Sequence, residues 1–366
     1  MQVVRAERDL GNDEDLSLLE GVGLLVKSPG VPGEAPLVVE ARRRGVTVWS
    51  EVELASRLLS NPILGVTGTN GKTTTVEWLG FILGAPVAGN VGRALSELDG
   101  DVEPGQLVVC ELSSFQLEDI VEFRPRIAVL LNLEPDHLDR HGSFDAYRDA
   151  KLRIFENQTS DDAAIVPRGF QHELGASRIE FASDDLLPAE PSLRGAHNRE
   201  NAAAATAAAR AAGASEERIA RGLREFKGVP HRLELVAERG GVTYVNDSKA
   251  TNVAAALRAL AAYEDAPVRL ILGGSRKGED FAPLAAALGP NISAVYVIGE
   301  TADELASAIP DTIRAADLAT AVERAASAAQ PGEVVLLSPA AASYDQFRDF
   351  EERGEEFKRL VANLPM

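Results

Sequence analysis

A glycine-rich turn, GVTGTNGKTTT at residues 65–75, is the stretch of the sequence best suited to chemistry. It departs from the common phosphate-loop pattern G-x-x-x-x-G-K-[ST], because Val66 stands where that pattern has its first glycine. Gly68 and Gly71 still let backbone N–H groups turn toward an anion, and a helix predicted over 72–83 would point its positive end there. A plain strand–turn–helix junction is the alternative, but the Gly-Lys-Thr ending favours a nucleotide phosphate.

The residues of this loop would share the work of holding the nucleotide. Lys72 can reach the terminal phosphates, and the Thr73 hydroxyl can ligate Mg²⁺. Backbone N–H groups of the glycine-rich part would hold the remaining phosphate oxygens. The nucleotide-binding residues predicted in the loop are Gly68, Thr69, Asn70, Gly71, Lys72, Thr73 and Thr74.

Three polar clusters follow farther along the chain. Glu111 closes the apolar run LVVC, Asp136-His137 follow the run IAVLLN, and Lys151 follows the helical turn FDAYRDA. Because ligands collect beyond the carboxyl ends of parallel strands, these clusters indicate one site, where Glu111 could complete a Mg²⁺ shell begun by Thr73. Each also has a structural alternative: a helix cap for Asp136, a satisfied polar group for His137, and a surface salt bridge for Lys151.

The elements that must position these residues alternate between strand and helix, which predicts an α/β fold of parallel sheets covered by helices. The strands are near-continuous apolar runs, as in sheets buried on both faces. The predicted strands are 62–67, 107–112, 127–132, 268–273, 294–299 and 333–338. The predicted helices are 72–83, 143–155, 251–262, 281–288, 319–329 and 344–361.

Two breaks in this alternation divide the 366 residues into predicted domains at 1–58, 59–228 and 229–366. The first break lies at LLSN, after a short leading piece with two expected strand–helix units, LLVKSPG and PLVVEARRRG. The second lies at a Gly-Val-Pro sequence that ends an alanine-rich region. Because alanine is the best helix former, the alanine-rich stretch 202–212 is expected to be a packed helix.

Composition excludes several classes of protein. The net charge is −19, from 37 basic and 56 acidic residues, and such a field repels a nucleic-acid backbone. One cysteine, Cys110, excludes an intrachain disulfide and suits a reducing compartment. The sequence has neither a secretory leader nor a run of 18 apolar residues, so we expect a cytoplasmic monomer without a membrane or nucleic-acid partner.

Several motifs together resemble the Mur ligases, and within that family the members that add D-glutamate. In chain order they are TGTNGKTT, ELSSFQLE, NLEPDHLDRHG, AKLRIFEN, GAHNRENAAAA, VPHRLE, NDSKATN and SPAAASYDQFRDFEERGEEF. The resemblance implies a three-domain architecture: an N-terminal domain for a uridine nucleotide, a central P-loop ATPase-type parallel sheet that binds ATP, and a C-terminal Rossmann-like domain that binds the amino acid. The first domain is expected to be truncated here, retaining of its substrate loop only Ser28-Pro29-Gly30-Val31-Pro32.

The implied reaction is the ATP-dependent addition of D-glutamate to UDP-N-acetylmuramoyl-L-alanine in peptidoglycan synthesis. ATP would phosphorylate the alanine carboxylate, and the amine of D-glutamate would attack the acyl phosphate and expel phosphate. The resemblance implies two Mg²⁺ sites, also suited to Mn²⁺: one held by Thr73 and Glu111, the other by His137 and a carbamylated Lys151. The implied catalytic residues are Lys72, His137, Lys151 and Arg232.

Further residues are matched to ligands by the same resemblance. Asn198 and Asn201, three apart on one helical face, would reach ATP, although helix capping is their alternative. Arg232 would reach the γ-phosphate when a hinge at 228–232 closes, and Asp247 would bind the ribose. The implied substrate-binding residues are Asn90 and Ser113 for the sugar nucleotide, with Lys249, Thr251, Lys277, Ser343 and Phe350 for D-glutamate and its surroundings.

Some of these assignments have alternatives. Ser343 opens SYDQ, a capping-box pattern that could simply start the helix 344–361. Phe350 is equally suited to a hydrophobic core. Glu134 stands where relatives often have threonine. Two other functions remain open: a related ligase of the folate-polyglutamylating type, and a nucleotide-binding regulatory or degenerate paralogue without turnover.

Overall fold

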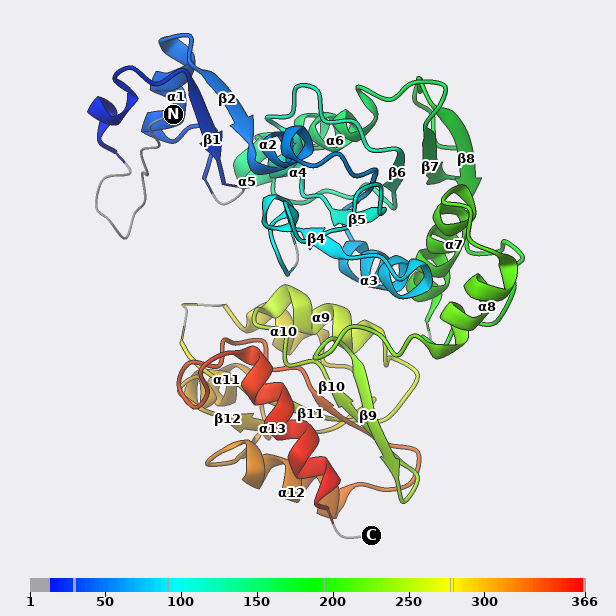
Figure 1. The fold of residues 1–366 in the computed structure, drawn as a ribbon. Coiled ribbons are helices and arrows are strands. Elements are labelled where there is room, and N and C mark those ends of the chain that lie inside the picture. The colour runs from blue at the N-terminus through cyan, green and yellow to red at the C-terminus, as the bar shows by residue number, and fades with distance from the viewer. Residues whose placement is uncertain are drawn as a thin grey trace. The chain divides into compact units, whose positions relative to one another are not determined.

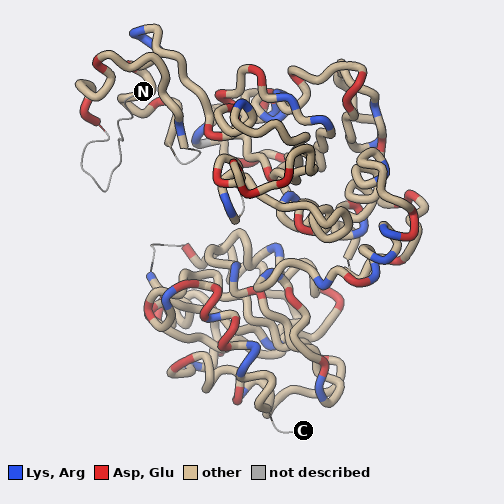
Figure 2. The backbone as a smooth tube through the Cα atoms, viewed as in Figure 1, with Lys and Arg blue, Asp and Glu red and all other residues tan. Residues whose placement is uncertain are grey.

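A computed structural model describes residues 14–28, 31–90, 92–193, 195–276, 278 and 280–364. The chain divides into two compact units, residues 1–226 and 227–366, which we describe separately (Figure 1). Basic side chains are interspersed among the acidic ones over both units (Figure 2). Within the described ranges, no helix combines the length and the apolar composition needed to cross a bilayer.

The first unit is built on a parallel sheet with the strand order β4-β5-β3-β6-β7-β8. Its strands are β3 Ile63–Thr67, β4 Val87–Gly89, β5 Val108–Glu111, β6 Ile127–Leu130, β7 Ala163–Pro167 and β8 Ser177–Phe181. Its helices are α3 Lys72–Leu83, α4 Ser114–Leu117, α5 Leu138–His141, α6 Phe144–Leu152, α7 Ala196–Ala211 and α8 Glu216–Glu225. The strands β5 and β6 flank β3, so their carboxyl ends lie at the same edge of the sheet as the phosphate loop. Glu111 ends β5 and Asp136-His137 follow β6, so these two polar clusters lie at this edge, as predicted.

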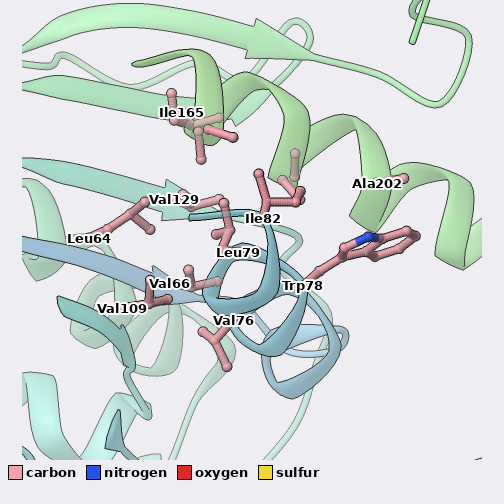
Figure 3. Close-up of a cluster of buried hydrophobic side chains, with 14 of the residues drawn as sticks. Leu64, Val66, Val76, Trp78, Leu79, Ile82, Val109, Val129, Ile165 and Ala202 are labelled. Atoms are coloured by element: carbon pink, nitrogen blue, oxygen red, sulfur yellow. The ribbon is translucent and has the colours of Figure 1, made fainter. Parts of the chain in front are cut away.

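Helices cover both faces of this sheet. On one face, α3, α7 and α8 pack on alternate strand residues such as Val66 and Val129, with Trp78 fully buried between the helices (Figure 3). Trp78 Nε1 donates to the Gly222 carbonyl at 3.1 Å. The alanines of α7 are buried in this cluster, so the predicted packed helix is confirmed. On the other face, α2 (Glu51–Leu58), α4 and the segment after α6 cover the alternate strand residues.

The leading piece contains two strand–helix units, as expected, but the second unit starts later than PLVVEARRRG. β1 (Leu24–Lys27) is present, but PLVVEARR forms the helix α1 (Pro36–Arg43), and the second strand is β2 (Thr47–Ser50), parallel to β1. Proline suits the first turn of a helix, and the apolar spacing of 37, 38 and 41 is helical rather than alternating. The expected number of strand–helix units is therefore confirmed as β1-α1 and β2-α2, whereas the placement of the second unit at PLVVEARRRG was wrong, because this segment supplies the helix of the first.

A buried carboxylate ties this leading piece to the central sheet. Glu53 of α2 is fully buried and accepts backbone N–H groups of Val121, Glu122 and Phe123 and the Nε of Arg57, at 2.7–3.1 Å. Burial acts to raise the pKa of Glu53, but these donors outweigh it and hold the pKa below its usual value. The carboxylate is therefore bound more favourably in the folded protein than in the unfolded chain.

Replacing Glu53 by glutamine should lower the free energy of unfolding of the first unit by about 3 kcal/mol, because the amide N–H₂ would face backbone donors. In the wild type this stabilisation is present above the unfolded pKa of about 4.3 and is lost as pH falls through the lower folded pKa. Urea unfolding followed by tryptophan fluorescence measures it, since Trp49 and Trp78 both lie in this unit. Glu97→Gln, in an exposed pair with Arg93, is the matched control and should change little.

The second unit is a mixed sheet with the order β13-β12-β11-β14-β10-β9, in which β9 runs antiparallel to β10. Its strands are β9 Glu234–Arg239, β10 Val242–Asn246, β11 Val268–Gly273, β12 Ile292–Ile298, β13 Ile313–Arg314 and β14 Val334–Leu337. Its helices are α9 Val253–Ala261, α10 Ala282–Ala287, α11 Ala302–Ala308, α12 Leu318–Ala328 and α13 Phe350–Ala362. α9, α10 and α11 cover one face, and α12 and α13 the other.

The last helix starts later than predicted. α13 begins at Phe350 with Asp349 as its N-cap, whose side chain accepts the Glu352 N–H. Ser343 does not cap it; the Ser343 carbonyl accepts the N–H groups of Gln346 and Phe347 in a turn. The sequence holds two capping signals six positions apart, and the helix starts at the second, so the expected helix 344–361 with a Ser343 cap was wrong.

Candidate active site

The phosphate loop occupies residues 68–71, between the end of β3 at Thr67 and the start of α3 at Lys72. Gly71 is the N-cap, with φ 82°, a conformation that favours glycine. A Cβ at Gly71 would also lie 2.2 Å from the Asn201 side-chain oxygen, so α7 lies directly against the loop. Asn198, one turn earlier on α7, is half-buried. Thr73 and Thr74 occupy the first turn of α3.

The segment after β6 braces this loop. Asn132 Oδ1 accepts the Asn70 N–H at 2.8 Å, and Asn132 Nδ2 donates to the Asn70 carbonyl. Asn70 Nδ2 in turn donates to Glu134 Oε2 at 2.9 Å, and Thr69 Oγ exchanges hydrogen bonds with the Glu134 backbone. Glu134, to which the sequence assigned no role, therefore helps hold the loop in shape.

Two lysine ammonium groups meet on one carbonyl oxygen of the loop. Lys72 Nζ donates to the Gly68 and Thr69 carbonyls at 2.8 and 2.9 Å, and Lys151 Nζ donates to the Gly68 carbonyl at 2.8 Å. Lys151 is 2% exposed, which excludes the surface salt bridge considered as its alternative. Burial, and then the charge of Lys72, lower the pKa of Lys151 to about 7. At neutral pH a substantial fraction of Lys151 is therefore the free amine.

Tyr147, which was not among the predicted site residues, links these lysines to His137. Its hydroxyl donates to Thr69 Oγ at 3.0 Å, its ring centroid lies 4.7 Å from Lys151 Nζ, and the His137 ring lies 6.3 Å away. His137 Nε2 is 3.6 Å from the Asp136 carboxylate. Tyr147 precedes Lys151 by four residues on α6, and that shared helix face is the signal that could have identified it.

The helix α4 supports His137 from the other side. The Phe115 ring lies 5.0 Å from the His137 ring and stacks on the His141 ring at 5.5 Å. Ser113, predicted to contact the sugar nucleotide, is the N-cap of α4 and forms a capping box with Gln116. Its hydroxyl therefore has an internal partner in this structure.

Glu111 offers a buried oxygen to a cation. Its side chain is 2% exposed, and Oε1 accepts Asn90 Nδ2 at 2.9 Å. Oε2 is buried and has no hydrogen-bond partner among the described residues. An unpaired buried carboxylate oxygen is costly, so a ligand that supplies positive charge there fits the site.

The donor set suits Mg²⁺ bound together with phosphates better than a metal held by protein alone. Among the described residues, no group of three or more His, Cys, Asp or Glu side chains is arranged to hold a metal ion. Mg²⁺ is commonly bound through one or two carboxylates, waters and substrate phosphates. Glu111, at the end of the strand next to the phosphate loop, provides such a carboxylate.

The second unit carries the other predicted residues around the ends of β10 and β14. Asp247 is buried; its oxygens accept the Ser338 hydroxyl at 2.7 Å and the Leu233 N–H at 3.2 Å. Burial raises the pKa of Asp247 to about 6, against the lowering effect of these hydrogen bonds and of the Arg232 charge. Asp247 and Arg232 are therefore electrostatically coupled.

The structure describes four of the five predicted amino-acid-binding residues. Lys249 Nζ lies 5.5 Å from the half-buried Phe350 ring, and the Thr251 N–H donates to the Lys249 carbonyl. Ser343 is buried. Lys277 lies outside the described residues. Its neighbour Arg276 pairs with Glu304.

Comparison with known proteins gives matches along both units. Residues 66–178 match the family described as Mur ligase middle domain, and residues 231–341 match Mur ligase, glutamate ligase domain. A protein of Anaeromyxobacter dehalogenans named UDP-N-acetylmuramoylalanine--D-glutamate ligase is 45% identical, over 97% of this chain and 87% of its own length. A protein of the same name from Acidobacterium capsulatum is 44% identical, over 92% of this chain and 82% of its own length.

Solved structures show the same fold at lower identity. The MurF ligase from Thermotoga maritima in complex with ADP aligns with a TM-score of 0.61 and 19% identity, covering 94% of this chain and 97% of that one. Because the alignment covers 94% of this chain, the likeness of fold includes the first unit, with its short leading piece, and the second unit.

Proposed function

This chain belongs to the Mur ligase family, and we propose that it joins D-glutamate to UDP-N-acetylmuramoyl-L-alanine with ATP, as the names of its relatives state for them. The observation that carries this proposal is the meeting of Lys72 and Lys151 on the Gly68 carbonyl of a phosphate loop. A ligase that activates a carboxylate must bring the anionic γ-phosphate to a second anion, and needs positive charge at that point. Lys72 would supply it directly, and Lys151, once carbamylated, through the metal ion that it would help to hold.

In the proposed reaction, the residues of the chain would bind ATP and offset the negative charge of its phosphates while the phosphoryl group is transferred and the amine attacks. Amide groups of 68–71 and the α3 N-terminus hold the phosphates of ATP, and Lys72 moves from the loop carbonyls to the transferring phosphoryl group. That group passes to the alanine carboxylate and gives an acyl phosphate and ADP. The D-glutamate amine then attacks the acyl carbon, and phosphate leaves with the formation of the amide. The further ATP-binding residues of this proposal are Asn198, Asn201, Arg232 and Asp247.

Thr73 and Glu111 would hold one Mg²⁺, and His137 with Lys151 a second. The ions supply positive charge to the phosphate and carboxylate oxygens. The orphaned Oε2 of Glu111 supports the first site. For the second, a lysine ammonium is a poor neighbour of a metal, and the proposal needs it converted to an anion.

We propose that Lys151 is carbamylated in the active enzyme. Only a neutral amine attacks CO₂, and a pKa of about 7 makes the amine available at neutral pH. The nitrogen lone pair forms the N–C bond, one C=O pair moves to oxygen, and one proton leaves to solvent, giving a carbamate. Its buried position beside Tyr147, whose ring lies 6.3 Å from the His137 ring, would then carry a negative charge in place of a positive one.

The division into an N-terminal uridine-nucleotide piece (1–58), an ATP domain (59–228) and an amino-acid domain (229–366) is part of this proposal. Asn90 and Ser113 would contact the sugar nucleotide. Ser343, Phe350, Lys249, Thr251 and Lys277 would surround D-glutamate. ATP and a nucleotide-linked precursor as substrates suit a cytoplasmic enzyme.

Phosphate release from ATP tests the proposal directly. It is measured with UDP-N-acetylmuramoyl-L-alanine present and with D-glutamate, L-glutamate or no amino acid added. Release that needs both the nucleotide substrate and D-glutamate is the expected result. A second series replaces the nucleotide substrate by a folate acceptor. Release that needs the folate acceptor and L-glutamate would instead assign the folate-polyglutamylating type, and ATP binding without release would assign a paralogue without turnover.

A further inference from the structure

Arg353 of α13 is a buried cation that the reaction described above does not use. It is 1% exposed, and its partners are a hydroxyl and backbone carbonyls. Nε donates to Ser248 Oγ at 2.9 Å and Nη2 to the Ser248 carbonyl at 2.8 Å. Nη1 donates to the Ala341 and Ala342 carbonyls, both at 3.1 Å. One guanidinium group therefore joins two loops that lie 93 positions apart at their nearest contacts, Ser248 and Ala341.

These loops follow neighbouring strands. Ser248 lies just after β10, and Ala341–Ala342 lie in the loop after β14, which is adjacent to β10 in the sheet. The Ala342 carbonyl also accepts the Ser275 N–H at 2.8 Å, from the loop after β11 on the other side of β14. Arg353 thus joins the loop after β10 to the loop after β14. The loop after β14 is in turn hydrogen-bonded to the loop after β11.

The space around the group is tight. A Cβ at Gly274 would lie 1.9 Å from the Ala342 carbonyl oxygen and 3.0 Å from Arg353 Nη1, and Gly274 has φ 154°. The Ser248 hydroxyl, which accepts the Arg353 Nε–H, also donates to the Phe350 carbonyl at 2.8 Å. Small shifts of the guanidinium would therefore displace all three loops.

A buried guanidinium is expensive compared with an apolar side chain of similar size. Burial lowers the pKa of Arg353 to about 10, so the group still stays charged at neutral pH. What a planar fork provides, and a lysine or methionine does not, is several fixed donor directions at once. Fixed spacing of the loops is the property that this residue supports.

We propose that Arg353 is the positioning residue of the D-glutamate site, which sets the spacing between the loops after β10, β14 and β11. The loops after β10 and β14 carry Lys249 and Ser343, so the inference rests on the proposed function of that site. In open α/β sheets, ligands bind beyond the carboxyl ends of the strands, where these loops lie. A dicarboxylic amino acid needs donors at two separated points, and loop spacing decides whether both are met.

The test compares Arg353→Lys, which keeps the charge but loses the fork, with Arg359→Lys on the same helix, whose exposed side chain pairs with Glu356. Arg353→Lys should lower kcat/KM for D-glutamate by about 100-fold. The KM for UDP-N-acetylmuramoyl-L-alanine should stay within about twofold of the wild-type value, because its proposed contacts Asn90 and Ser113 lie in the first unit. Arg359→Lys should match the wild type in both.

Hydrogen–deuterium exchange supplies a readout that does not depend on turnover. In Arg353→Lys, exchange should increase in the loops 247–251 and 339–344 and stay unchanged in β11 and β12. Ser248→Ala removes one acceptor of Arg353 and the hydrogen bond to the Phe350 carbonyl, but leaves the three backbone acceptors of Arg353 in place. It should show a smaller change of the same pattern and serves if Arg353→Lys fails to fold. Unchanged loop exchange, or an equal loss of kcat/KM for every substrate, would overturn the positioning role. A wild-type protein without D-glutamate-dependent phosphate release would refute the proposed function instead, with the exchange result still deciding whether Arg353 orders the loops.

Discussion

Replacing Lys151 by alanine should reduce phosphate release about 1000-fold, the upper end of the range for loss of one group that stabilises transition-state charge. The side chain is buried beside the phosphate loop, and no neighbouring lysine can substitute for a carbamate, because Lys72 is needed at the phosphoryl group. Added formate or acetate should restore part of the activity by filling the vacated space with a carboxylate. The measurement is initial rate against concentration of the added acid, with folding checked by thermal unfolding.

The controls separate a carbamate from a simple cation. Arg148→Ala removes an exposed side chain of the same helix and should leave activity unchanged. Methylammonium should not rescue Lys151→Ala, since a cation is the wrong charge for a second metal site. Rescue by methylammonium instead of acetate, or full activity without any addition, would refute the carbamate and the metal role of Lys151.

The sequence was enough to predict the central sheet and the phosphate loop, for physical reasons. Runs such as IAVLLN are apolar on both faces, so only a strand covered on both sides suits them. The loop required glycine at Gly71, because of its positive φ and because Asn201 lies against it. The strands and the glycine-rich turn depend mainly on residue types close together in the sequence, so they can be predicted without knowledge of the fold.

Other features depended on contacts between distant segments, and the sequence could not give them. Lys151 is followed by Leu152 and Arg153 and looks like an ordinary helical lysine, but 83 positions separate it from the carbonyl that it contacts. Its lowered pKa follows from burial and from Lys72, neither of which is a local property. The start of α13 is a second case, because the sequence has a capping signal at Ser343 and another at Asp349, and only the structure shows that the helix uses Asp349.

Because the chain is strongly acidic, cations at the proposed site indicate where anionic ligands can bind. A net charge of −19 disfavours the approach of ATP and of a dicarboxylic amino acid, so attraction must come from single groups at the site. Lys72 provides it in the first unit, and the buried Arg353 adds a charge beneath the loops of the second. Ligand binding at such a site should weaken with added salt less than binding to an exposed basic surface, because Lys72 is half-buried and Arg353 is buried.

Glu111→Gln separates the metal role of this carboxylate from its role in the fold. Glutamine keeps the size and can still accept the Asn90 hydrogen bond, while the charge at the orphaned Oε2 is lost. Without metal, the free energy of unfolding should change by about 1 kcal/mol or less, because Oε2 has no hydrogen bond within the described residues to lose. Turnover should fall at least about 100-fold, since one ligand of the phosphate-bound Mg²⁺ is gone.

Ligand-dependent stability distinguishes this result from a general defect. With Mg²⁺ and a non-hydrolysable ATP analogue at about 100 times the dissociation constant, the wild type should gain about 2.7 kcal/mol of stability. Glu111→Gln should gain far less from the same mixture, yet respond like the wild type to the analogue with EDTA, where no metal is bound. If the variant kept the full Mg²⁺-dependent gain, Glu111 would not be a metal ligand, and its unpaired buried oxygen would need another partner. If it lost stability without any ligand, the carboxylate would be part of the fold through its attraction to Lys151.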